Sequence, residues 1–144
     1  MPTPFRLPVL LSLALATGLA LGSCKKDSAT PAPTVLTPSQ QLTTGSWQLD
    51  QVKQGGQVST GNAIKDRYSL TFRPDGTLTR RLLADNTTYP GAWMLTSGNT
   101  LLRLTDNKGV GTDYTLAALT ATELRYAFTN NANQLEERQF SSQP

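Results

Sequence analysis

Short segments of alternating apolar and polar residues fill the chain after Gly45, and turn residues separate them. In Arg67–Arg73, for example, aromatic or aliphatic residues alternate with Ser and Thr. A period of two is typical of a β-strand with one buried face. Pro74-Asp75-Gly76 follows as a strong turn signal, and together with Thr77–Leu83 it predicts a hairpin. The pattern therefore predicts an all-β domain.

Eight such segments are expected, most of them joined by tight connections. They are Ser46–Lys53, Arg67–Arg73, Thr77–Leu83, Tyr89–Thr96, Thr100–Thr105, Thr112–Leu119, Glu123–Thr129 and Gln134–Phe140. Tight connections require antiparallel neighbours, and a sheet of this size can close on itself so that no edge stays open. We therefore predict an eight-stranded antiparallel up-and-down barrel, with a two-sheet β-sandwich as the alternative.

A short helical turn is expected before the first strand. Thr37 suits the N-cap position, Pro38 the first helical position, and Gln40 has the spacing of a capping box. These residues predict a helical turn over Pro38–Thr43, with Gly45 as its stop.

The start of the chain has the features of a signal peptide. Arg6 provides a basic start, Leu7–Leu21 is apolar, and Gly22 and Ser23 are small; a signal peptide needs these three parts in this order. The apolar run is shorter than the about 20 residues that a membrane-spanning helix needs.

Cys24, the only cysteine of the chain, directly follows Leu21-Gly22-Ser23. This sequence resembles the lipobox of bacterial lipoproteins, Leu-x-(Gly/Ala/Ser)-Cys. The resemblance implies that cleavage between Ser23 and Cys24 removes residues 1–23, and that Cys24 receives a diacylglycerol thioether and an acyl chain such as palmitate on its amine. Two or more chains anchor a protein stably to a membrane, and Lys25, where Asp would signal inner-membrane retention, indicates the outer membrane of a Gram-negative bacterium. An ordinary secretory signal with a chance cysteine is the alternative.

Residues 24–37 are rich in proline and small residues. Such a composition favours an extended or disordered linker. We predict that this segment is a flexible tether, which holds a single folded domain, residues 38–144, clear of the lipid headgroups.

The composition excludes several kinds of site. The chain has no histidine and one cysteine, so zinc and haem sites that rely on these residues, and Ser-His-Asp or Cys-His nucleophiles, are not available. Glu136 and Glu137 are strand neighbours that face opposite sides, so they do not form a carboxylate pair. Residues 106–109 lack the ligand spacing of a calcium loop.

The charge of the chain is small. Without Arg6 the net charge is 12 − 10 = +2, and the sequence has no basic cluster that would indicate nucleic-acid binding. We predict no metal, no cofactor, no nucleic-acid partner and no enzymatic activity.

Gly45-Ser46-Trp47 opens the first expected strand directly after the helical turn. This order resembles lipocalins, in which a turn of helix plugs one end of a barrel and the Trp packs above it. Later features resemble the small lipocalin-like domains of bacterial lipoproteins: the Phe72–Thr77 hairpin, Gly91-Ala92-Trp93 with the turn Ser97-Gly98-Asn99, and Thr112-Asp113-Tyr114. The resemblance covers about residues 38–142. It implies that an arginine packs against Trp47, with Arg138 as the first candidate and Arg125 as the second.

The alternation also predicts which side chains face the barrel interior. They are Trp47, Leu70, Leu78, Trp93, Leu102, Tyr114, Leu116 and Tyr126. A barrel of this size is nearly filled by its side chains or holds one small ligand, and the sequence leaves both open. In the second case Trp93, Tyr114 and Tyr126 are expected to line an apolar wall for a fatty acyl chain or a small aromatic compound.

Arg80 lies between Leu78 and Leu82 in the alternation, so its register position faces inward. At the mouth of a barrel it would bind a ligand carboxylate through both arms of its guanidinium. The other interpretation, which the sequence favours, is that Arg80 reaches solvent from a strand end.

Two functions are consistent with these observations. The first is a lipid-anchored envelope protein that binds a small hydrophobic ligand inside its barrel. The alternative is a solid barrel that binds another envelope protein, with the glycine-rich loop Gly55–Asn62 as the contact.

Overall fold

The folded part of the chain begins with a short helix, α1 (Pro38–Leu42), whose first turn is held by a capping box. The Thr37 hydroxyl accepts from the backbone N–H of Gln40, and the Gln40 side chain accepts from the backbone N–H of Thr37. The predicted turn is therefore confirmed, but its predicted stop at Gly45 is wrong. The helix ends earlier because Thr43 is its C-cap, with its backbone N–H and its hydroxyl both bonded to the last carbonyls.

The computed structural model describes residues 35–144, and these form nine strands after the helix. The strands are β1 (Ser46–Gln54), β2 (Gln57–Thr60), β3 (Tyr68–Phe72), β4 (Thr77–Leu82), β5 (Thr88–Thr96), β6 (Leu101–Thr105), β7 (Gly111–Leu119), β8 (Glu123–Thr129) and β9 (Leu135–Gln143). Two 3₁₀ turns, η1 (Gly61–Ala63) and η2 (Ser97–Asn99), lie between strands. The predicted signal peptide with Ser23, the predicted lipidation site Cys24 and most of the predicted tether lie outside the described residues.

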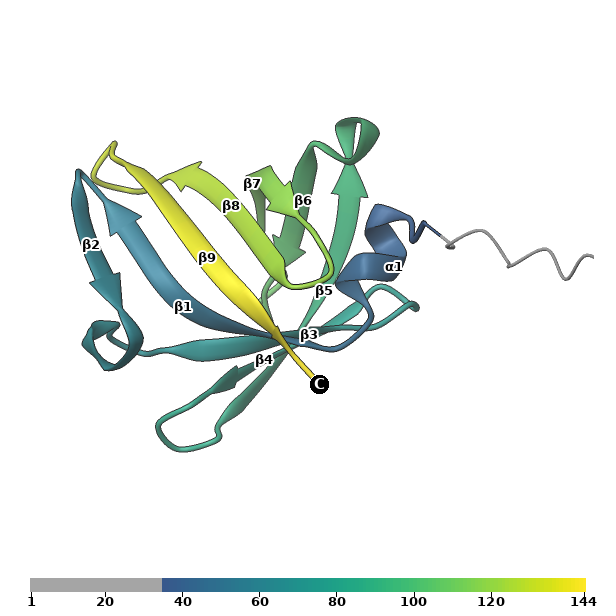
Figure 1. Cartoon of the computed structure of the whole chain (residues 1–144), viewed down its shortest axis with the longest axis horizontal. Helices are drawn as coiled ribbons and strands as arrows, with labels where there is room; N and C mark the ends of the chain where they lie inside the picture. Colours follow the sequence, from purple (N-terminus) through teal and green to yellow (C-terminus); the bar gives the residue numbers. More distant parts are fainter. Residues whose placement is uncertain (1–34) are drawn as a thin grey trace, which may run out of the picture. The chain divides into compact units, whose positions relative to one another are not determined.

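The sheet closes into a barrel because β9 pairs with β1 as well as with β8. All pairings are antiparallel, and β3 to β9 follow one another in chain order (Figure 1). The closing ladder runs from Ser46 paired with Gln143 to Gln54 paired with Glu136. The predicted up-and-down barrel is therefore confirmed, and the sandwich alternative is wrong.

One extra strand, β2, corrects the predicted loop over Gly55–Asn62. Gly55 and Gly56 both have positive φ, +54° and +85°, and they connect Gln54 to its partner Gln57. Two residues with positive φ make the tight hairpin turn that joins antiparallel strands with the least distortion, and Gly-Gly is one of its preferred sequences. The loop therefore contains a β-hairpin.

The first strand changes its partner halfway along. Its start pairs with β3, its end with β2, and the register against β9 shifts between Leu49 and Gln51. Arg67 supports this bulge, since its Nε donates to the Leu49 carbonyl at 2.6 Å and its guanidinium meets the Asp50 carboxylate at 2.7 Å. Arg67 therefore holds the backbone of β1 at the point where its register changes.

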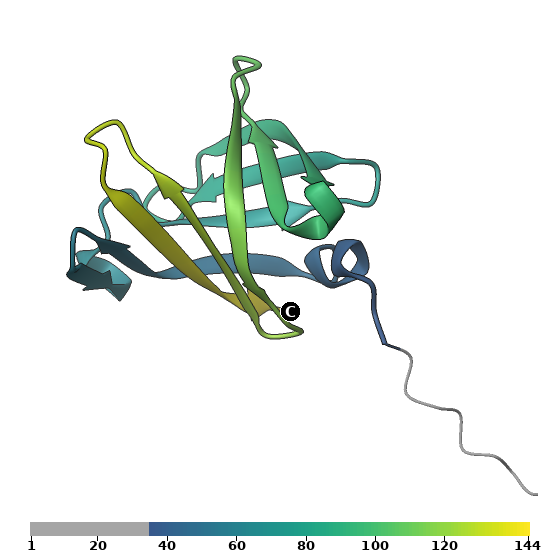
Figure 2. The ribbon, with the colours of Figure 1, turned by 90° about the horizontal axis from the view of Figure 1, so that it is seen from above.

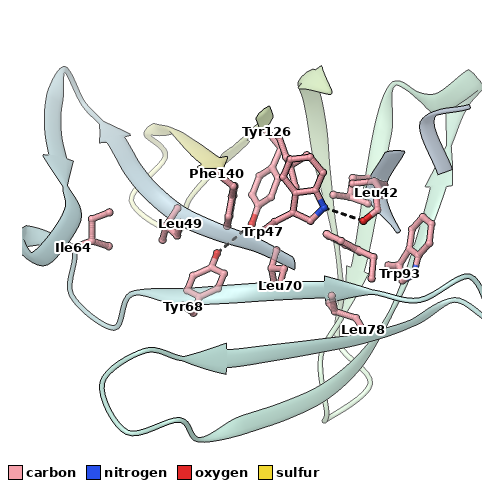
Figure 3. Packing of buried hydrophobic residues seen from close by; sticks show 13 residues of the cluster. Leu42, Trp47, Leu49, Ile64, Tyr68, Leu70, Leu78, Trp93, Tyr126 and Phe140 are labelled. Carbon is pink, nitrogen blue, oxygen red and sulfur yellow. Dashed lines mark hydrogen bonds between the residues drawn. The ribbon is translucent and has the colours of Figure 1, made fainter. Parts of the chain in front are cut away.

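The end of the barrel near α1 is packed with side chains (Figure 3). Trp47 and Leu42 are fully buried, and the Trp47 indole N–H donates to the Leu42 carbonyl at 2.9 Å. The buried hydrophobic cluster comprises Leu42, Trp47, Leu49, Ile64, Tyr68, Leu70, Phe72, Leu78, Trp93, Leu102, Leu124, Tyr126 and Phe140. Six of the eight residues predicted to face inward belong to it, and the other two, Tyr114 and Leu116, are half-buried and pack against it.

The two ends of the barrel differ. Antiparallel order places the loops after β3, β5 and β7 at the end that α1 covers, and the loops after β4, β6 and β8 at the other end (Figures 1 and 2). Residues 35–144 form one compact unit that contains the whole buried cluster, so this part of the chain is expected to fold by itself. Within residues 35–144, no helix is long and apolar enough to cross a membrane.

Candidate functional site

A cavity of about 630 Å³ lies within the barrel, at the end away from α1. Its wall is formed by leucine side chains and tyrosine rings from β3 to β8, and its rim by residues of the loop after β6. The wall-forming residues include Leu70, Leu78, Leu82, Leu104, Tyr114 and Tyr126. This volume is within the range of about 300–1,000 Å³ that is typical of small-molecule sites. The interior is therefore packed at one end and hollow at the other.

Arg80 lines this cavity, as its inward register position predicts. Its guanidinium carbon lies 4.2 Å from the centre of the Tyr68 ring, a geometry that gives a cation–π contact. The Nε of Arg80 is buried and has no hydrogen-bond partner within the described residues. Arg80 as a whole is half-buried, so its Nε is shielded while the side chain lines the cavity wall; whether it binds a ligand or reaches solvent from a strand end stays a prediction.

A second arginine, Arg138, lines the same cavity from β9. Its Nε and Nη2 both lie 2.7 Å from one carboxylate oxygen of Glu136, and its Nη1 donates to the Tyr68 hydroxyl at 2.7 Å. Burial by itself lowers the pKa of Arg138, but Tyr68, Tyr126 and the Glu136 carboxylate outweigh it and raise the pKa above its ordinary value. Arg138 is therefore a permanent cation that already has a carboxylate partner.

Two tyrosines of the cavity, Tyr114 and Tyr126, have raised pKa values. Burial raises the pKa of Tyr126 well above its usual value, and Tyr68 beside it raises it further. Burial and Tyr68 also raise the pKa of Tyr114. The Tyr126 and Tyr68 hydroxyls are 3.2 Å apart, and the Tyr68 hydroxyl accepts from Arg138, so Tyr68 connects Tyr126 to Arg138.

Of the predicted ligand-binding residues, Tyr114, Tyr126 and Arg80 line the cavity and Trp93 does not. Trp93 lies at the packed end, where its ring meets Phe72 edge-on at 5.4 Å and its N–H donates to the Arg73 carbonyl. The prediction for Trp93 is therefore corrected. Alternation predicts the face of a strand on which a side chain lies, but not its depth along the barrel.

The predicted arginine contact with Trp47 is also corrected. In the closing ladder the residue opposite Trp47 is Ser142, whereas Arg138 lies opposite Val52. Arg138 instead packs over Phe128 and Tyr68, at 5.1 and 5.8 Å from the ring centres. Arg125 is 3.7 Å from Glu123, and no arginine of the described residues forms a cation–π contact with Trp47.

Gly45 has a steric role at the same end of the barrel. A Cβ atom on Gly45 would lie 2.5 Å from the backbone oxygen of Gln143, which is closer than such atoms come in real structures. Glycine before Ser46-Trp47 therefore allows the end of β9 to pass close to the start of β1.

Tyr68 and Glu136 belong to the cavity network but were not among the predicted site residues. Glu136 is buried although it is charged. Its spacing from Arg138, two residues along one strand, places both side chains on the same face. That spacing was the available sequence signal, since a buried carboxylate needs a charged or hydrogen-bonding partner.

Residues that could hold a metal are not gathered in this part of the chain. Among residues 35–144, no group of three or more Asp, Glu, Cys or His side chains lies close together.

The residues of the Thr112-Asp113-Tyr114 sequence face two sides of the sheet. Asp113 faces outward and pairs with Arg103 at 3.3 Å, while Thr112 and Tyr114 line the cavity.

Solved structures share this fold at low sequence identity. A lipocalin-like protein from Bacteroides uniformis has a TM-score of 0.55 at 16% sequence identity, over 71% of this chain and 99% of its own. The fold is lipocalin-like. A designed protein, described as a de novo fluorescence-activating β-barrel, has a TM-score of 0.50 at 12% identity, over 75% of this chain and all of its own. By sequence, no family and no curated protein matches the chain, so the likeness concerns the fold alone.

Proposed function

We propose that this lipocalin-like barrel binds a small hydrophobic ligand non-covalently in the cavity at its open end. The observation that carries the proposal is the cavity of about 630 Å³ in a barrel whose other end is fully packed. Barrels of this size hold one small ligand when their side chains do not fill them. The proposal includes no catalytic step.

Binding would be driven by the burial of apolar ligand surface against the leucine and tyrosine wall. Such burial stabilises a complex by about 25 cal/mol per Å² of apolar surface removed from water. Tyr114 and Tyr126 pack with 4.6 Å between their ring centres and a tilt of 53° between their planes, and they offer an aromatic wall to the ligand.

Native mass spectrometry tests this function. The chain from residue 24 on, with Cys24 replaced by Ser, would be expressed in its source bacterium and purified gently. We expect a bound small molecule that is released on denaturation. A clean apo mass, unchanged after incubation with fatty acids, would contradict the proposal.

A blocked cavity provides the matched comparison. Leu104 lines the cavity and is half-buried, so Leu104→Trp is expected to fill the space and abolish the bound mass. Met94, half-exposed on the neighbouring strand, gives the control Met94→Trp, which should retain the ligand. Circular dichroism would confirm that both variants are folded.

We also propose that Cys24 anchors the protein in the outer membrane through lipid. The lipobox-like sequence supports this, and Cys24→Ala is expected to move the protein from the membrane fraction to the soluble fraction. Metabolic labelling with a palmitate analogue should label the wild type and not the variant. A variant that still fractionates with membranes would refute the lipid anchor.

A protein-binding role remains the second candidate, because one feature outside the barrel favours it. Val58 on β2 and Leu135 at the start of β9 are 53% and 66% exposed, and a hollow of about 290 Å³ is lined by Leu135 together with Gly55 and Gly56. The same native mass spectra discriminate the two functions, since this candidate requires no bound small molecule.

A further inference from the structure

The charges inside the cavity do not cancel. Arg80 and Arg138 contribute two positive charges and Glu136 one negative charge, which leaves a net charge of +1 within the barrel. Glu136 is within ion-pair distance of Arg138, and no ion pair of the described residues includes Arg80. Arg80 is half-buried, and its Nε is shielded from solvent without a hydrogen-bond partner; a buried polar group is costly unless it is paired.

The carboxylates at the rim do not supply the missing partner. Asp66 and Asp106 are exposed to solvent, where water and salt screen their charges. Asp106 already accepts the backbone N–H groups of Lys108 and Val110, and Lys108 adds a positive charge at the same rim. Arg80 therefore keeps a buried Nε and an unpaired charge within the cavity.

We infer that the ligand is an amphipathic monoanion whose carboxylate binds Arg80 inside the barrel; this inference rests on the proposed ligand-binding function. A guanidinium donates two parallel hydrogen bonds to a carboxylate, and such a bond would engage the unpartnered nitrogen of Arg80. One negative charge brings the net charge of the interior to zero. The alkyl part of the ligand lies along the apolar wall that includes Leu82 and Leu104. A fatty-acid-like molecule combines these properties.

Calorimetric titration with two probes of equal chain length tests the inference. Dodecanoate and dodecanol differ only in their head group, and both fit the proposed apolar wall. For the chain from residue 24 with Cys24→Ser, we expect dodecanoate to bind at least about tenfold more tightly than dodecanol, which corresponds to about 1.4 kcal/mol. In Arg80→Gln the two probes should bind equally, with the affinity for dodecanol unchanged.

Arg81 provides the matched control, because it is the next residue of β4 and is exposed. Arg81→Gln removes the same charge from the chain and should keep the preference for dodecanoate. Retained binding of dodecanol shows that the cavity of Arg80→Gln is intact. Equal binding of both probes to the wild type, or an unchanged preference in Arg80→Gln, would overturn the inference and leave the proposed function standing. If neither probe binds the wild type, both the inference and the proposed binding of a hydrophobic ligand are contradicted.

Discussion

Trp47→Ala is expected to destabilise the domain by about 3–5 kcal/mol, since the removal of a buried aromatic side chain costs about this much. Trp47 is fully buried and its indole N–H holds the Leu42 carbonyl at 2.9 Å, so the change also loosens α1 from the barrel (Figure 3). A domain of this size has a net stability of about 5–15 kcal/mol. Urea unfolding followed by circular dichroism should therefore show a transition shifted to much lower urea, or a domain that is partly unfolded without it.

Two variants separate the packing of Trp47 from its hydrogen bond. Trp47→Phe retains most of the ring but leaves the Leu42 carbonyl without its donor, and should cost about 1–3 kcal/mol. Met94→Ala removes a side chain that is 51% exposed, and should change the free energy of unfolding by less than about 0.5 kcal/mol. A loss below about 1 kcal/mol in Trp47→Ala would contradict the packed end of the barrel.

Much of this architecture is predictable from the period of two in the sequence. Strand β8 has the predicted bounds Glu123–Thr129, and most other strands begin and end within one residue of the prediction. The exceptions are β2, which lies in a predicted loop, and β9, which continues past Phe140 to Gln143. The last residues of β9 carry no apolar alternation, and they belong to the strand because their backbone pairs with the start of β1. Hydrogen bonds between the backbones of two strands do not depend on side-chain polarity, so the alternation in the sequence does not predict them.

The site was less predictable than the fold, for a related reason. Alternation places Trp93, Tyr114 and Arg80 on the inner face, and all three side chains do lie there. Their depth along the barrel depends on the register between strands, which turns and bulges decide. The closing ladder, for example, pairs Trp47 with Ser142, and the shift between Leu49 and Gln51 moves the partner of Arg138 by one residue, to Val52.

The second large effect is expected for Glu136→Gln. The Glu136 side chain is 11% exposed and its ion pair with Arg138 has contacts of 2.7 Å. Removal of one partner of a buried pair costs about 3–5 kcal/mol, and the partial exposure of Arg138, 24%, places the expected loss at the lower end of that range. Urea unfolding of the ligand-free protein measures this loss of stability.

Glu137→Gln is the matched control, because Glu137 is the next residue of β9 and faces the other side. This variant should have a free energy of unfolding within about 0.5 kcal/mol of the wild type.

The same variant links stability to the ligand. Without the Glu136 carboxylate the interior charge rises from +1 to +2. Arg138 then has no carboxylate partner, and Arg80 has none in the wild type either. A carboxylate ligand should therefore bind Glu136→Gln more tightly than it binds the wild type, by about tenfold for one additional charge-assisted hydrogen bond. Saturating dodecanoate stabilises the folded state according to its affinity, and so it should restore more of the free energy of unfolding in Glu136→Gln than it adds to the wild type. Dodecanol should stabilise both proteins equally. An equal gain from dodecanoate in both proteins would mean that the carboxylate does not reach Arg138, and would confine its binding to Arg80.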